Sequence, residues 1–197
     1  MRTGALVLGY HGCNRDVGES LVNGDRPFRP SKNDYDWLGD GIYFWENDPR
    51  RALEWAEFMA GHPKFKSRVK EPFAVGAVIE LGNCLDLTEA ESLEMLKTAY
   101  DHLANAFHAS NTPLPENEPA VSSDVDLVKR YLDCAVVNYL HDLREQQDRE
   151  PFDTVRGPFF EGKELYPGAR IQKKTHVQLC VRNPAMIRGV FHITPKS

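Results

Sequence analysis

Long apolar runs are missing from this 197-residue sequence. No segment approaches the ~20 apolar residues needed to cross a bilayer, and no apolar leader opens the chain. The four cysteines lie far apart without a CxxC pair, which indicates neither a zinc ribbon nor a disulfide-rich scaffold. We therefore expect a cytoplasmic protein with reduced thiols and no membrane contact.

Signatures of three common enzyme classes are also missing. There is no GxGxxG for a Rossmann dinucleotide fold and no GxSxG for a serine hydrolase. The seven histidines show no HExxH spacing, so no metal is predicted. A net charge of −5 provides no overall basic field for nucleic acid, although it leaves room for a local basic groove.

What the sequence does have is a mixture of strand and helix patterns in a chain that is 41% hydrophobic, which suits one domain over residues 1–197. Five strand-like stretches are β-branched or continuously apolar. They cover residues 5–12, 41–45, 73–87 with a turn at Gly82, 175–184 and 188–193. The expected fold class is α+β.

Three helices are predicted from caps and from apolar residues at helical spacing. Asp48 followed by Pro49 begins a helix that carries Ala52, Trp55, Ala56 and Met59 on one face. Thr88 and Glu91 form a capping box before apolar positions from Leu93 to Phe107, and a third pattern runs from Val125 to Leu143. The last two helices predict a helical insertion at about residues 88–147.

The segment "LGDGIYFWEN" places two glycines immediately before Tyr43. Glycines allow the backbone to approach a ligand closely, and the tyrosine ring can form one wall of a flat slot. An aromatic cluster on a strand is also what ordinary core packing produces. The segment alone leaves both interpretations open.

Further segments in the same order favour the ligand slot: "YHGC" before it, and "RRALEWA" and "THVQLCV" after it. Together they resemble the ADP-ribosyltransferase superfamily, in its branch similar to the poly-ADP-ribose polymerases, between about Tyr10 and Phe191. The resemblance implies a split, mostly antiparallel β core with flanking helices. It also implies NAD as co-substrate, bound in the cleft between the two half-sheets.

The resemblance assigns roles to five positions. His11 would bind the 2'-hydroxyl of the nicotinamide ribose, and the Gly12 backbone would hold the carboxamide. Tyr43 would stack on the nicotinamide ring. Arg51 stands where relatives have a small hydroxyl residue that contacts the carboxamide, so that it is either a substitute contact or a solvated helix residue. Asn33, or Ser31 in the same turn-rich segment, would lie near the adenosine side of NAD.

The third catalytic position departs from the family. Relatives have a glutamate early in the late strand, where this sequence has Gln178. Glutamine forms hydrogen bonds but cannot act as a general base. A loose transition state or an anionic acceptor would remove the need for a base. Otherwise Glu161 or Glu164, in the preceding loop, would supply the carboxylate.

That loop stands where the superfamily recognises its acceptor. Its aromatic residues are interleaved with basic ones, which suits a nucleic-acid or phosphate-bearing acceptor and equally a solvated loop with core anchors. They are Phe159, Phe160, Tyr166, Lys163, Arg170, Lys173 and Lys174.

The resemblance therefore implies an NAD-dependent mono-ADP-ribosyltransferase that modifies a protein or nucleic acid. Compact relatives are often bacterial toxins or phage-defence effectors, so an antitoxin protein is a further possible partner. Two alternatives stay open: an NAD glycohydrolase, in which water is the acceptor, and a catalytically inactive NAD-binding module.

Overall fold

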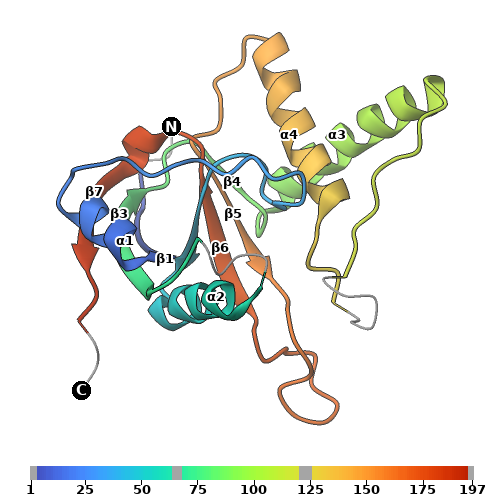
Figure 1. The fold of residues 1–197 in the computed structure, drawn as a ribbon. Coiled ribbons are helices and arrows are strands. Elements are labelled where there is room, and N and C mark those ends of the chain that lie inside the picture. The colour runs from blue at the N-terminus through green and yellow to red at the C-terminus, as the bar shows by residue number, and fades with distance from the viewer. Residues whose placement is uncertain (1–3, 64–67, 120–125, 195–197) are drawn as a thin grey trace.

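The computed structural model describes residues 4–63, 68–119 and 126–194 and has an α+β fold (Figure 1). A mixed seven-stranded sheet has the order β4-β5-β6-β2-β1-β3-β7. The strands are β1 (Leu6–Asn14), β2 (Ile42–Glu46), β3 (Pro72–Glu80), β4 (Cys84–Asp86), β5 (Thr154–Phe159), β6 (His176–Val181) and β7 (Ile187–His192). The helices are α1 (Arg15–Val22), α2 (Pro49–Gly61), α3 (Ala90–Ala109) and α4 (Tyr131–Gln146), with a 3₁₀ turn η1 (Pro184–Met186).

The sheet consists of two halves that are joined weakly. β1 pairs with β3 at nine positions, whereas β1 and β2 pair only at Gly9–Glu46 and Tyr10–Trp45. All neighbouring strands are antiparallel except β4 and β5. The half β4-β5-β6-β2 and the half β1-β3-β7 therefore part from each other beyond Tyr10.

Two apolar clusters lie on opposite faces of the sheet, because successive side chains along a strand alternate between faces. One cluster joins Leu85, Val155 and Cys180 to apolar residues of α3 and α4. The other contains Ile42, Phe44 and Leu179. The helices α3 and α4 pack on each other on one side of the molecule, away from α1 and α2 (Figure 1).

One strand prediction is confirmed and one strand was missed. The turn predicted at Gly82 divides the stretch over residues 73–87 into β3 and β4, whereas β5 was not predicted, because its end was assigned to a loop. Gly157 and Pro158 argued against a strand there. β4 pairs with β5 only from Thr154 to Arg156, so Pro158 lies beyond the ladder that would require its missing N–H.

All three predicted helices are present, but the predicted ends of some of them are wrong. The Asp48 cap is confirmed, since its Oδ1 accepts the Arg51 N–H at 3.0 Å. The capping box is wrong: the Thr88 hydroxyl and N–H both donate to Asp86, and α3 begins at Ala90. α4 begins at Tyr131, while Val125 lies outside the described residues.

α1 was not predicted, because Gly18 interrupts a short polar segment. Packing explains that glycine, since a Cβ there would lie 2.3 Å from Phe73 Cδ1. Within the described part of the chain, no helix has the length and apolar character needed to cross a membrane.

Candidate functional site

His11 lies on β1 at the point where the two half-sheets part. Its Nδ1 donates to the Tyr43 carbonyl oxygen at 2.8 Å, so the side chain takes the place of a strand-to-strand hydrogen bond. The ring packs edge-on against Phe28 and near Phe44. Burial lowers the pKa of His11, against a smaller opposing effect of its bond to Tyr43. The imidazole is therefore neutral, and a donating Nδ1 leaves a lone pair on Nε2.

Gly12 is covered by the first turns of α2. A Cβ at this position would lie 2.1 Å from the Ala52 carbonyl oxygen, so only glycine allows this approach. Trp55 of the same helix would lie 3.2 Å away. α2 is therefore held directly over the end of β1.

Tyr43 has its hydroxyl fixed by the glycine turn that precedes it. The hydroxyl donates to the Gly39 carbonyl at 2.8 Å and accepts the Leu38 N–H at 3.0 Å. Burial raises the pKa of Tyr43 well above its ordinary value. The glycine at 39 has φ +78°, which is the conformation that this turn requires. The half-buried ring packs beside the α3–α4 cluster.

The predicted catalytic residues do not all lie on one face. Trp45 pairs with both Tyr10 and Gln178, which puts the Tyr43 and Gln178 side chains on one face of the sheet. His11 follows Tyr10 and lies on the other face, beside Phe44. One ligand can contact both faces only at the gap where β1 and β2 part.

Gln178 has a close partner that the sequence did not indicate. Trp37 Nε1 donates to its Oε1 at 2.6 Å. The indole of Trp37 also covers Gly157, the residue paired with Gln178 on β5. The amide is thus held in one orientation, with one lone pair of its carbonyl oxygen occupied.

Glu161 forms ion pairs with two cations. One oxygen lies 3.1 Å from the Arg51 guanidinium, and the other lies 2.9 Å from Lys174 Nζ. Arg51 also pairs with Glu54 at 2.8 Å and is only 15% exposed. Arg51 is therefore not a solvated helix residue; it ties α2 to the loop between β5 and β6.

Asn33 is exposed in the segment before β2. Its amide nitrogen donates to Ser31 at 2.8 Å and to Asp36 at 3.2 Å. These bonds shape the loop itself, and none of them joins Asn33 to His11, Tyr43 or Gln178.

The sequence predicts no role for His176. It is the first residue of β6 and 8% exposed, and its Nδ1 bonds the Lys174 carbonyl at 2.6 Å. Nε2 is buried without a hydrogen-bond partner among the described residues, as is Trp45 Nε1. Burial lowers the pKa of His176, mainly by desolvation. The only signal in the sequence was its place two residues before Gln178.

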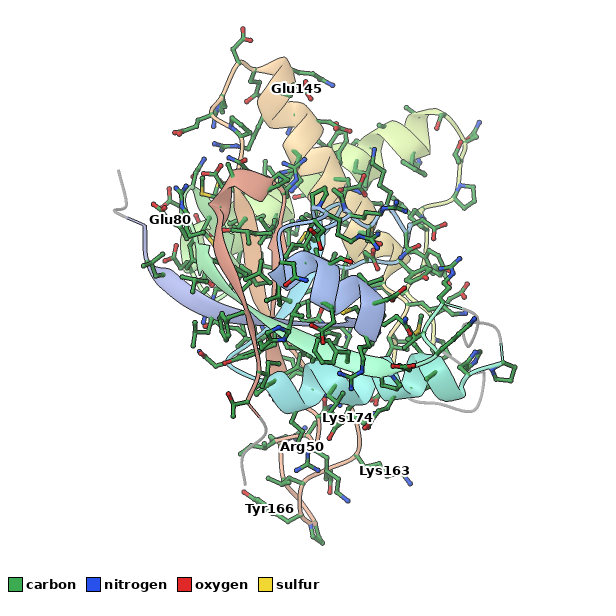
Figure 2. All side chains as sticks on the ribbon, turned by 60° about the vertical axis from the view of Figure 1, so that its left-hand side comes forward. Arg50, Glu80, Glu145, Lys163, Tyr166 and Lys174 are labelled. Atoms are coloured by element: carbon green, nitrogen blue, oxygen red, sulfur yellow. The ribbon has the colours of Figure 1, made fainter. Side chains whose placement is uncertain are left out.

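The loop between β5 and β6 forms an arm over residues 160–175 that extends past α2 (Figure 2). Backbone bonds close the arm, from Leu165 to Ile171 and from Lys173 to Lys163. Lys163, Tyr166 and Lys174 lie along it, and Arg50 of α2 lies at its base (Figure 2). Tyr166 is 57% exposed, so the aromatic ring is not an anchor in the core.

A pocket of about 310 Å³ lies between α3, α4 and β5. Trp37 and Phe159 form part of its wall, 5.3 Å apart between ring centroids. Gln178 is joined to this wall through the Trp37 bond. Across the described ranges, no group of three or more His, Cys, Asp or Glu side chains comes together as metal ligands.

Comparisons with known proteins give one relative. The chain is similar to the uncharacterized protein MJ0359 of Methanocaldococcus jannaschii, with 25% identity over 198 positions that cover 91% of this chain and 83% of the relative. No family model matches the sequence, and no solved structure matches it. The similarity to the archaeal protein extends over nearly the whole chain, so it is not confined to one motif.

Proposed function

We propose that the chain is an NAD-dependent mono-ADP-ribosyltransferase with an ADP-ribosyltransferase-like split core. One observation carries the proposal: the His11–Tyr43 hydrogen bond joins the two motif residues where the half-sheets part. The bond fixes the tautomer of His11 with its proton on Nδ1, which leaves a lone pair on Nε2. A neutral Nε2 is an acceptor suited to a ribose hydroxyl.

The fit of NAD to these residues depends on the gap between β1 and β2. α2 covers Gly12, so a carboxamide would have to reach the Gly12 backbone from the gap rather than from the α2 side. The fixed hydroxyl of Tyr43 gives its ring one orientation before any ligand binds. Since His11 and Tyr43 occupy opposite faces, NAD would lie across the gap.

The transfer itself needs little from a base. The bond between the ribose and nicotinamide breaks with its electron pair moving to the ring nitrogen, and the acceptor forms the new bond to the ribose. Gln178 cannot take a proton, and both oxygens of Glu161 bind cations. An acceptor that is already anionic, a carboxylate or a phosphate, therefore suits this chain best. A protein or a nucleic acid can provide such a group.

Release of nicotinamide from NAD tests the proposal, measured with and without cell lysate. We expect release that depends on lysate and falls at least ~100-fold in His11→Ala, because a displaced ribose loses its reactive orientation. The matched control is His102→Ala, an exposed histidine of α3, which should retain the wild-type rate.

Other outcomes identify the alternatives. Release that needs no lysate would indicate an NAD glycohydrolase. NAD binding without release would indicate an inactive binding module, for which the occupied Gln178 oxygen is the supporting observation. If the protein neither releases nicotinamide nor binds NAD, the proposal is rejected.

A further inference from the structure

The pocket between α3, α4 and β5 has a composition that selects a ligand. Apolar side chains such as Leu93 and Leu96 form most of its wall, together with the rings of Trp37, Tyr100, Phe159 and Phe160. Its volume of about 310 Å³ is at the lower end of the range for small-molecule sites. Flat aromatic walls at this size suit one planar ring system.

Charge adds a second selection. The pocket is lined by two cations, Lys97 and Arg130, and by one carboxylate, Asp133. Lys97 already binds both oxygens of Asp101 at 2.6 Å. Arg130 has the weaker pairing, with Asp133 at 3.3 Å.

Arg130 also carries an unused donor. Its guanidinium lies 5.0 Å from the centroid of Phe159, and its Nε is buried without a hydrogen-bond partner among the residues that the structure describes. A buried donor left unpaired costs free energy, on the order of 1–3 kcal/mol, which an anionic ligand would recover. Arg130 and Phe159 both line the pocket, so an anion could reach the unused donor only if the guanidinium turned toward the pocket.

We propose that this pocket binds a planar aromatic ring that carries one negatively charged group. The ring would pack among Trp37, Phe159 and Tyr100, and the anion would pair with Arg130. Both aromatic carboxylates and mononucleotides have this chemistry. The inference does not depend on the proposed transferase activity, since it rests on a different set of side chains.

Isothermal titration calorimetry on the full chain tests the proposal with three probes: 2-naphthoate, the neutral 2-naphthamide and AMP. We expect 2-naphthoate to bind at least ~10-fold more tightly than 2-naphthamide, because a desolvated charged pair adds to the ring contact. If AMP binds more tightly than 2-naphthoate, the natural source is a mononucleotide; the reverse order indicates an aromatic carboxylate.

Two pairs of variants locate the site. Arg130→Met should remove the preference for the charged probe while 2-naphthamide still binds, whereas Lys97→Met should keep most of that preference. Leu93→Trp should fill the mouth of the pocket and abolish binding of all probes. Its control is Leu53→Trp, at a comparably exposed position on α2.

Three results would overturn the proposal: no binding of either charged probe at millimolar concentration, equal affinity for 2-naphthoate and 2-naphthamide, or binding unchanged in Leu93→Trp. Binding of 2-naphthamide to Arg130→Met would show that this variant has lost the charge but kept its fold. A thermal unfolding curve like that of the wild type would show that Leu93→Trp is folded and that its pocket is blocked.

Discussion

Burial lowers the pKa of both His11 and His141, but the surroundings of the two histidines differ. His11 lies half-buried at the edge of the gap between β1 and β2 and donates to the Tyr43 carbonyl. His141 lies on α4, 6% exposed, and both of its ring nitrogens are buried without a hydrogen-bond partner in the described part of the chain. Arg182 and Arg144 add positive charge near it.

The comparison separates two reasons for burying an imidazole. At the β1–β2 junction the ring is part of the backbone pairing and leaves one nitrogen for a ligand. At α4 the ring acts as an apolar filler, packed edge-on to Phe152 at 6.0 Å. Substitutions at the junction should therefore lower stability by displacing the backbone. In the α4 region, stability should instead depend on whether the buried ring is charged.

Gly12→Ala should have the largest effect on stability. The new Cβ would meet the Ala52 carbonyl, a backbone atom that cannot move without shifting α2. We expect a loss of about 3 kcal/mol in the free energy of unfolding, measured by urea titration. Gly61→Ala is the control, since no atom lies within 4 Å of its added Cβ. Equal stability of the two variants would contradict the close contact between Gly12 and α2.

The sequence could predict much of this junction because its determinants are local. Asp48 caps α2 three residues before Arg51, and the glycines before Tyr43 form the turn that binds its hydroxyl. Continuously apolar or β-branched stretches likewise indicate the central strands. Such features depend on neighbours in the chain, which a sequence displays directly.

The contacts around the third catalytic position could not be predicted, because they join distant segments. Trp37 and Gln178 are 141 residues apart, and Arg51 and Glu161 are 110 apart. Nothing near Glu161 indicates that α2 will neutralise it. The position of His11 on the face opposite Tyr43 likewise follows from the register of β1 against β2.

Acid should destabilise the α4 region through His141. Burial and the two arginines lower its pKa from 6.5 to about 3 in the folded chain. Between pH 6.5 and about pH 3, His141 therefore binds a proton in the unfolded chain but not in the folded chain. Stability contributed by the neutral ring is complete above pH 6.5 and falls by about 1.4 kcal/mol per pH unit below it.

Urea unfolding at pH 7 and pH 5 measures this loss, with His141→Leu as the comparison. The variant should differ from the wild type by less than ~1 kcal/mol at pH 7, because no hydrogen bond is removed. At pH 5 it should be the more stable of the two. Parallel losses in both proteins would show that other groups cause the acid sensitivity.

Glu161→Gln should have the smallest effect and tests how the arm is attached to the junction. The variant loses the ion pairs with Arg51 and Lys174, yet Arg51 retains Glu54, so we expect about 1 kcal/mol of lost stability. Nicotinamide release should change less than ~10-fold, because a carboxylate bound to two cations is poorly placed to accept a proton. Glu164→Gln in the same arm is the control. A loss of ~100-fold or more in the rate of nicotinamide release, in Glu161→Gln but not in Glu164→Gln, would instead identify Glu161 as the general base. The arm would then contribute a catalytic residue to the site at the β1–β2 junction.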